Sequence, residues 1–195
     1  MRSETATHVI WSALGADVRA RFAAARALVL DVDGVMTDGR IHMSTDGSEL
    51  MTFDVRDGSG TWMLHRAGIR VGIVTGRSTG IPEMRAGALR IDELVSGCRE
   101  KAQGLARVLS AWGIAPEHCA YGGDDLLDGP AMRLAGLAVA VRDAQPEVQE
   151  IAHYVTRRPG GRGAVREVAD LLLEAHGVRA EVLRHFVGPR PEDGA

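Results

Sequence analysis

Residues 27–39 read ALVLDVDGVMTDG, in which an apolar run leads directly into two aspartates. The apolar run is long enough for a buried strand and too short for an ordinary helix. Asp31 and Asp33 follow at the end of this expected strand, and Gly34 allows the backbone to bend sharply away from it. The stretch therefore predicts a buried strand that carries two carboxylates at its carboxyl end.

The rest of the chain alternates between strand-like and helix-like stretches. Expected strands follow at residues 70–75, 93–96, 119–123 and 137–141, and expected helices at residues 9–25, 61–68, 79–88, 99–113, 131–136 and 163–177. Residues 40–44 and 49–53 flank an Asp46-Gly47 pair and predict a β-hairpin. This alternation predicts an α/β fold, a Rossmann-like doubly wound parallel sheet with a β-hairpin after the first strand.

Length and composition indicate one soluble globular domain. A chain of 195 residues that is 45% hydrophobic and 25% charged can form a sizeable core. We place this domain at residues 27–177, after an N-terminal helical segment at residues 1–26 and before a C-terminal tail at residues 178–195. Residues 188–195, the end of that tail, are expected to be disordered.

The composition also argues against several classes of partner. The formal net charge of −3 and the 4% aromatic content disfavour nucleic acid. No apolar run approaches the roughly 20 residues that span a bilayer, and the first residues lack a secretory signal pattern. Cys98 and Cys119 lack metal-like spacing and fit reduced, buried residues better than a disulfide. We expect a cytoplasmic protein with neither nucleic acid nor a membrane as its partner.

Polar residues gather where several expected strands end. They are Asp31, Asp33, Thr75, Gly76, Arg77, Asp124 and Asp125, and Lys101 opens a helix that reaches the same edge. Ligands of parallel α/β sheets bind outside the carboxyl ends of the strands. We therefore expect these residues, which come from separate strands, to form one site.

This combination of side chains fits a phosphomonoester hydrolase. An aspartate can act as a nucleophile and form an aspartyl phosphate, while a second acid protonates the leaving oxygen and later activates water. Clustered carboxylates repel one another unless a cation neutralises them, and all-oxygen ligands suit Mg²⁺. Thr75 and Lys101 would hold the phosphate oxygens and offset their charge in the transition state.

Four segments, LVLDVDGVMTDG, IVTGR, Lys101 and YGGDDLLD, resemble in this order the motifs of the haloacid dehalogenase superfamily of phosphatases. With FDVRDGSG and GGRGAVREV, the chain resembles the family that removes phosphate from 3-deoxy-D-manno-octulosonate (Kdo) 8-phosphate. The resemblance covers roughly residues 15–177. It implies the haloacid dehalogenase fold and a Mg²⁺-dependent phosphatase that supplies Kdo for lipopolysaccharide.

The resemblance also implies a role for each matching residue. Asp31 would be the nucleophile, and Asp33 the acid/base, with its backbone carbonyl on Mg²⁺. Asp124 would be the remaining metal ligand, with Asp125 and Asp128 as supporting acids. The residues expected to contact the substrate are Asp33, Asp54, Val55, Arg56, Asp57, Gly58, Arg77, Arg85 and Lys101. Among the arginines we expect Arg77 foremost to pair with the sugar-acid carboxylate, because a guanidinium can bind it through two donors.

The spacing of the motifs leaves no room for a cap domain. Only a hairpin and one helix separate Asp33 from Thr75, and only one helix and a loop separate Lys101 from the strand before Asp124. An uncapped site is open to water and has few groups that recognise a sugar. The resemblance implies that a homotetramer closes the site, with the hairpins packed together and residues 160–163 near a neighbour's site.

Other interpretations remain open at this point. Position 62 holds Trp where the resemblance leads us to expect Arg, so the sugar is less well defined than the phosphate chemistry. One alternative is a phosphatase of a nine-carbon 3-deoxy-nonulosonate 9-phosphate or another sugar phosphate. A weaker alternative is a non-catalytic phosphoacceptor domain, although an acid two residues after Asp31 favours hydrolysis. Taken singly, Arg56, Arg77 and Arg85 also fit ordinary surface charges.

Overall fold

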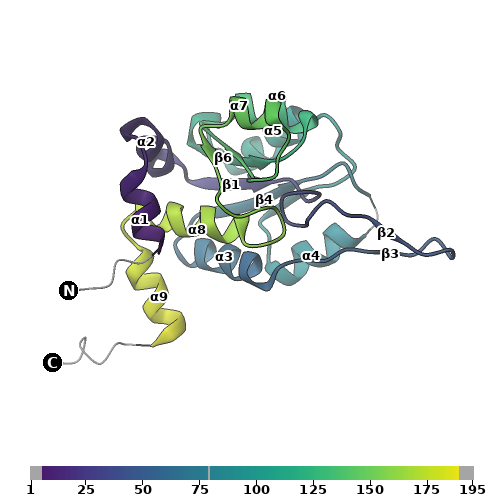
Figure 1. The fold of residues 1–195 in the computed structure, drawn as a ribbon, viewed down its shortest axis with the longest axis horizontal. Helices are drawn as coiled ribbons and strands as arrows, with labels where there is room; N and C mark the ends of the chain where they lie inside the picture. The colour runs from purple at the N-terminus through teal and green to yellow at the C-terminus, as the bar shows by residue number, and fades with distance from the viewer. Residues whose placement is uncertain (1–5, 79, 189–195) are drawn as a thin grey trace.

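The computed structural model describes residues 6–78 and 80–188, and its centre is a six-stranded parallel sheet. The strands are β1 (Ala27–Leu30), β4 (Arg70–Val74), β5 (Glu93–Val95), β6 (Cys119–Gly123), β7 (Leu137–Ala140) and β8 (Tyr154–Val155). Their order in the sheet is β5-β4-β1-β6-β7-β8 (Figure 1). β1 pairs with β4 on one side and with β6 on the other, so the chain crosses over in both directions from the centre. The predicted doubly wound α/β fold is confirmed.

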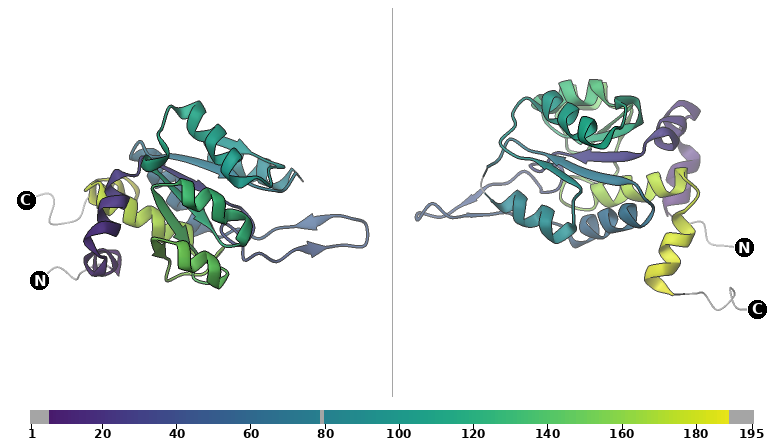
Figure 2. Two further views of the ribbon diagram at one scale, coloured as in Figure 1. Left: turned by 90° about the horizontal axis from the view of Figure 1, so that it is seen from above. Right: turned by 180° about the vertical axis from the view of Figure 1, so that it is seen from behind.

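Helices cover both faces of this sheet (Figures 1 and 2). One layer holds α3 (Val55–Arg66), α4 (Ile81–Leu89) and α8 (Ala164–Ala175), and the other holds α5 (Lys101–Trp112), α6 (Gly129–Leu134) and α7 (Pro146–Ile151). At one end, α1 (Ala6–Ala13), α2 (Ala16–Ala24) and α9 (Arg179–Val187) pack beside α8. Two short 3-10 helices, η1 (Pro116–His118) and η2 (Leu126–Asp128), flank β6.

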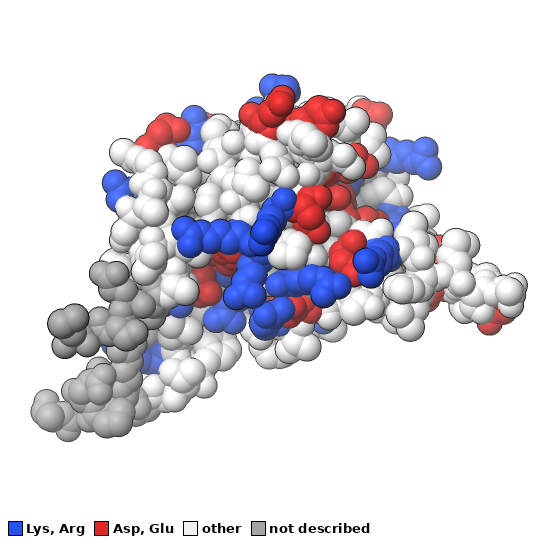
Figure 3. Space-filling view, in the orientation of Figure 1, with Lys and Arg blue, Asp and Glu red and all other residues white. Residues whose placement is uncertain are grey.

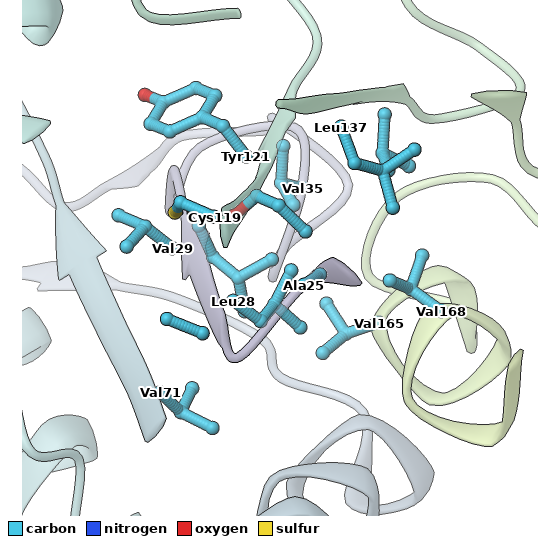
Figure 4. Packing of buried hydrophobic residues seen from close by; sticks show 14 of the residues in the cluster. Ala25, Leu28, Val29, Val35, Val71, Cys119, Tyr121, Leu137, Val165 and Val168 are labelled. Carbon is cyan, nitrogen blue, oxygen red and sulfur yellow. Dashed lines mark hydrogen bonds between the residues drawn. The ribbon is translucent and has the colours of Figure 1, made fainter. Parts of the chain in front are cut away.

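The core lies between the sheet and its two helical layers. Every residue of β1 is buried, which explains its uninterrupted apolar sequence, because a central parallel strand is covered on both faces. Figure 4 shows Leu28 of β1 on the side where Val165 and Val168 project from α8. Because this packing fixes β1, Asp31, the residue that follows the strand, is held at the carboxyl edge of the sheet.

Several local predictions need correction. Helix α3 begins at Val55 rather than at residue 61, because the Asp54 side chain accepts a hydrogen bond from the Arg56 backbone N–H and caps it. The expected N-terminal helix is divided into α1 and α2 at Gly15. Helix α7 and strand β8 were not predicted, since both are short. Helix α9 occupies part of the expected tail and buries Val182; residues 189–195, predicted to be disordered, lie outside the described residues.

The β-hairpin is present but shorter than predicted. Its strands, β2 (His42–Met43) and β3 (Glu49–Leu50), form a separate antiparallel sheet that projects away from the body (Figure 2). In the described residues, only this hairpin and α3 lie between β1 and β4, and no cap domain covers the strand ends. No helix within residues 6–78 and 80–188 is long and apolar enough to cross a bilayer.

Candidate active site

Asp31 lies directly after β1, at the carboxyl edge of the sheet. Its backbone N–H donates to the carbonyl of Gly122 (3.0 Å), so the strand register continues to this residue. The carboxylate accepts a hydrogen bond from the Val32 backbone N–H (2.6 Å), and only 7% of the residue is exposed. Burial, and then the neighbouring charge of Asp128, raise the pKa of Asp31 to about 7.

Lys101 is the first residue of α5 and places a buried ammonium group beside Asp31. Its Nζ lies 2.5 Å from Asp31 Oδ1 and 3.6 Å from Asp128 Oδ1, and donates to the Val74 carbonyl (3.0 Å). The side chain is only 4% exposed. Lys101 is also the only lysine in the sequence, since every other basic residue is arginine. The space between these three oxygens suits the compact ammonium group of a lysine better than the larger, planar guanidinium group of an arginine.

Three carboxylates converge beside this ammonium group. One oxygen from each of Asp31, Asp124 and Asp128 lies within 4.8 Å of the other two. Burial and the charges of Asp128 and Asp31 raise the pKa of Asp124 to about 8. Its Oδ1 is buried and has no hydrogen-bond partner among residues 6–78 and 80–188. Since a buried acceptor is normally satisfied, this oxygen is suited to a cation, and carboxylate oxygens are the hard ligands that Mg²⁺ prefers.

Asp128 holds the loop after β6 in place. Its carboxylate accepts hydrogen bonds from the Tyr121 hydroxyl (2.8 Å) and from the backbone N–H groups of Asp124 (3.0 Å) and Asp125 (3.3 Å). The Asp125 carboxylate caps η2 by accepting from the Leu126 N–H (2.6 Å). Both acids therefore shape the loop that presents Asp124.

Glycine is required where the chain leaves β1. Gly34 has φ of +78°, and a Cβ at this position would overlap the Asp124 carboxylate. Gly160 and Gly161 pack against the same turn, and the Gly161 N–H donates to the Val35 carbonyl (2.9 Å). The predicted glycine-rich loop at residues 160–163 thus supports the turn that carries Asp33.

A cavity of about 410 Å³ opens over these groups. It is lined by Asp31, Asp33, Gly39, Ile41, Gly76, Arg77, Arg99, Lys101, Asp124, Asp125 and Leu127. Thr75 lies just behind it; the residue is fully buried, and its hydroxyl accepts a hydrogen bond from the Arg77 N–H (3.1 Å). Arg99 was not predicted to line the cavity, although it lies only two residues before Lys101, which was. Sequence reasoning also missed Gly39, Ile41 and Leu127, which carry no recognisable motif.

Asp33 is held by an arginine at the side of this cavity. Arg77 Nε donates to both carboxylate oxygens of Asp33, each at 2.8 Å. Arg77 Nη1 donates to Glu49 Oε2 in strand β3 of the hairpin (2.7 Å). Arg77 therefore already binds two protein carboxylates, and Glu49 is a further residue at the site that sequence reasoning missed.

None of the expected substrate residues 54–58 lines the cavity over Asp31. Asp54 and Arg56 line a second cavity of about 480 Å³, together with Arg158 and Arg162. Figure 3 shows basic side chains gathered beside an acidic patch on this face. Val55 is 80% exposed and lines neither of these two cavities. The structure therefore separates these residues from Asp31 within one chain.

Three of the expected substrate residues, Asp57, Gly58 and Arg85, have contacts within the chain. Asp57 is 2% exposed, and its carboxylate accepts from the N–H groups of Gly163 (3.1 Å) and Arg166 (2.8 Å), which caps α8. Gly58 lies below Arg85, whose guanidinium stacks 5.0 Å from the Phe53 ring centre. Arg85 Nε is buried and has no hydrogen-bond partner in the part of the chain that the structure describes, and burial lowers the pKa of Arg85.

Comparisons with known proteins identify the chain. Residues 85–166 match the haloacid dehalogenase-like hydrolase family. The 3-deoxy-D-manno-octulosonate 8-phosphate phosphatase KdsC of Escherichia coli (strain K12) is 49% identical over 84% of this chain and 87% of its own. The chain belongs to the 3-deoxy-D-manno-octulosonate 8-phosphate phosphatase family. The family resemblance expected from the motifs is confirmed.

Solved structures of this phosphatase family have the same fold. The Yersinia pestis phosphatase superposes with a TM-score of 0.83 at 48% identity, covering 85% of this chain and 89% of that chain. The Moraxella catarrhalis phosphatase gives a TM-score of 0.85 at 35% identity, covering 87% and 98%. That second structure is a complex with a magnesium ion, a phosphate ion and a KDO molecule.

Proposed function

We propose that this chain hydrolyses Kdo 8-phosphate to Kdo and phosphate. The observation that carries the proposal is the buried Asp31–Lys101 pair beside Asp124, whose Oδ1 lacks a protein partner. The similarity to KdsC proteins over most of the chain supports the choice of substrate. Asp31, Asp124 and the Asp33 carbonyl would hold Mg²⁺, which neutralises the clustered charge and polarises the phosphate.

The residues present supply both halves of a two-step hydrolysis. An Asp31 carboxylate oxygen attacks phosphorus, the bond from phosphorus to the sugar oxygen breaks, and Asp33 gives its proton to that leaving oxygen. Asp33 then accepts a proton from the water that attacks the aspartyl phosphate, which releases phosphate and restores the Asp31 carboxylate. Lys101 would offset the negative charge that gathers around the phosphoryl group, and the Thr75 hydroxyl would bind a phosphate oxygen.

Recognition of the sugar acid needs groups beyond the phosphate cavity. Arg77 pairs with two carboxylates and Arg56 pairs with one, whereas Arg85 forms no ion pair among the described residues. We therefore infer that Arg85 and Arg56, rather than Arg77, bind the substrate carboxylate, which reverses the order expected from sequence. A third carboxylate at Arg77 would meet repulsion from the two already there.

The assembly we propose is a homotetramer. Ile41, Met43 and Leu50 expose apolar side chains on the hairpin, and Trp62 and Met84 do so on α3 and α4. Exposed apolar surface of this kind marks interaction sites, and a neighbouring chain would bring its Arg85 region to the open cavity. Light scattering should give about four times 20.8 kDa; a fully active monomer would contradict the assembly.

The deciding experiment measures phosphate release from three substrates. Kdo 8-phosphate, a nine-carbon nonulosonate 9-phosphate and a neutral sugar phosphate are compared by kcat/KM, with Mg²⁺ and with EDTA. We expect Kdo 8-phosphate to give the highest value, and only with Mg²⁺. We also expect Arg85→Ala to lower kcat/KM for the acids more than for the neutral sugar. A preference for the neutral sugar phosphate, or full activity in EDTA, would contradict the proposal.

The proposed cellular role is Kdo supply for lipopolysaccharide synthesis in the cytoplasm. Both Cys98 and Cys119 are free thiols, as is usual in a reducing compartment. Burial also raises the pKa of the Cys119 thiol to about 12, so it stays protonated and unreactive.

A further inference from the structure

The hairpin has a single polar connection to the rest of the described chain. Hydrogen bonds of residues 42–50 stay within the hairpin, at the Ser44–Ser48 turn and between β2 and β3. The exception is the Glu49 carboxylate, which accepts from Arg77 Nη1 at 2.7 Å. The side chain of Glu49 is only 22% exposed, although the neighbouring Leu50 is 62% exposed. One acid of an otherwise exposed hairpin is thus turned toward the active site.

Arg77 connects this acid to Asp33. Its guanidinium plane is fixed at two points, because Nε binds Asp33 and Nη1 binds Glu49. The backbone beneath it is also fixed, since the Arg77 N–H donates to Thr75 Oγ1 (3.1 Å) and its carbonyl accepts from the Gly97 N–H (2.7 Å). The Arg77 side chain is 13% exposed, whereas that of Asp33 remains 35% exposed at the cavity. The more rigid partner therefore sets the position of the more accessible carboxyl group.

We propose that Glu49 is a positioning residue that acts through Arg77 to hold the Asp33 carboxyl group where it can reach the leaving oxygen. Without Glu49, Arg77 keeps one contact instead of two, and its three methylene groups regain rotational freedom. The Asp33 carboxyl group then shares that freedom, because both of its oxygens bind the same Nε. Proton transfer requires the donor within hydrogen-bond reach of the accepting oxygen, so a small displacement lowers the rate.

A purely structural role for Glu49 predicts a different result. An ion pair that only anchors the hairpin would affect every substrate equally, through assembly or access to the cavity. In kcat/KM, the positioning of Asp33 affects only substrates whose leaving oxygen needs a proton, because the later activation of water by Asp33 is not included in this ratio. A sugar alkoxide needs one, whereas a 4-nitrophenolate ion is stable without it. Since kcat/KM covers the steps up to aspartyl phosphate formation, the comparison isolates proton donation.

The inference rests on the proposed two-step phosphatase mechanism, and its test uses Glu49→Gln and Glu49→Asp. The first keeps the shape of the side chain and removes its charge, while the second keeps the charge and shortens the reach. Each is compared with wild type for kcat/KM on a sugar phosphate and on 4-nitrophenyl phosphate. Asp46→Asn is the matched control, because it removes a carboxylate from the same hairpin at the exposed turn. Light scattering and circular dichroism accompany each variant.

We expect both Glu49 variants to lose about tenfold in kcat/KM on the sugar phosphate and less than about twofold on 4-nitrophenyl phosphate. Asp46→Asn should match wild type on both. Equal losses on the two substrates, wild-type behaviour of Glu49→Asp, or a loss that accompanies dissociation would each overturn the proposal. The comparison uses whichever sugar phosphate the wild type hydrolyses, so failure of Kdo 8-phosphate as the substrate would refute the proposed function without deciding this inference.

Discussion

Replacing Lys101 by methionine tests whether its charge neutralises the buried carboxylates of Asp31 and Asp128. Methionine has a similar length and fills the buried space, but it leaves Asp31 and Asp128 without their cation. Removal of one partner from a buried ion pair costs about 3–5 kcal/mol, because the remaining charge stays desolvated. For a chain of this size, 1 kcal/mol corresponds to about 2–4 °C in Tm, so the variant should melt about 6–20 °C lower in EDTA.

The size of this loss should depend on pH. Burial and Asp128 already raise the pKa of Asp31 to about 7, and Lys101 opposes both effects. Removing Lys101 therefore raises this pKa further above its value in the unfolded chain. A carboxyl group with a raised pKa stabilises the fold while protonated and loses that contribution as pH rises through its pKa. The Tm difference between wild type and Lys101→Met should thus be larger near pH 8 than near pH 5.

Thermal unfolding in EDTA at the two pH values measures this difference. Arg107→Met is the matched control, because it removes a cation from an exposed position on the same helix, α5. It should leave Tm within about 2 °C of wild type at both pH values. Lys101→Met should also lower turnover at least about 100-fold, through loss of charge stabilisation at the phosphoryl group. An equal Tm loss at both pH values would refute charge neutralisation as the role of Lys101.

Three further predictions follow from the same contacts. Asp31→Asn removes the nucleophile with little change in shape, so turnover of the best substrate should fall at least about 1000-fold; wild-type turnover would refute the assignment. Mg²⁺ at about 100 times its Kd should raise Tm by about 5–10 °C relative to EDTA near pH 8. The rise in Tm should be smaller near pH 5.5, because Asp31 and Asp124, with pKa values of about 7 and 8, must lose protons before they bind Mg²⁺. Asp57→Ala removes the acceptor of the Gly163 and Arg166 N–H groups at the start of α8, so Tm should fall by about 1–8 °C. The KM for Kdo 8-phosphate should stay within about twofold, and a large rise in KM would instead place Asp57 on the substrate.

The parts of the fold predicted correctly are those with strong local signals. The run before Asp31 is apolar throughout because β1 is buried on both faces, and α5 shows a regular apolar spacing that ends at Gly113. The start of α3 was missed because Gly58 and Gly60 weaken its helical pattern, while its cap at Asp54 is a single residue. Short elements such as β8 are stabilised by a neighbouring strand, and a two-residue stretch carries too little sequence for a pattern.

In the candidate site, too, some residues could be predicted from the sequence and others could not. Asp31, Lys101 and Asp124 were predictable as neighbours, because the carboxyl ends of parallel strands meet at one edge. Asp57 carries a charge and lies within a motif, but the chain uses it to cap α8, a contact with a segment more than a hundred residues away. Glu49 was not predictable, because an acid in a hairpin is ordinarily a solvated residue. Only its distance to Arg77 distinguishes it.

Because no cap domain covers the strand ends in the described residues, the groups that bind the phosphoryl group differ from those that would recognise the sugar. A cavity of about 410 Å³ that is open at one side can hold a phosphoryl group against Asp31, Lys101 and a cation, and almost any phosphomonoester satisfies those contacts. Discrimination among sugar acids then depends on the arginines around the phosphoryl group: Arg99 lines this cavity, and Arg85 lies outside its lining with a buried Nε that has no hydrogen-bond partner among the described residues. In the proposed homotetramer, the Arg85 of a neighbouring chain would reach this cavity, so substrate selection would depend on assembly. A variant that weakens the contact between chains should then lose discrimination between acidic and neutral sugar phosphates before it loses phosphatase chemistry.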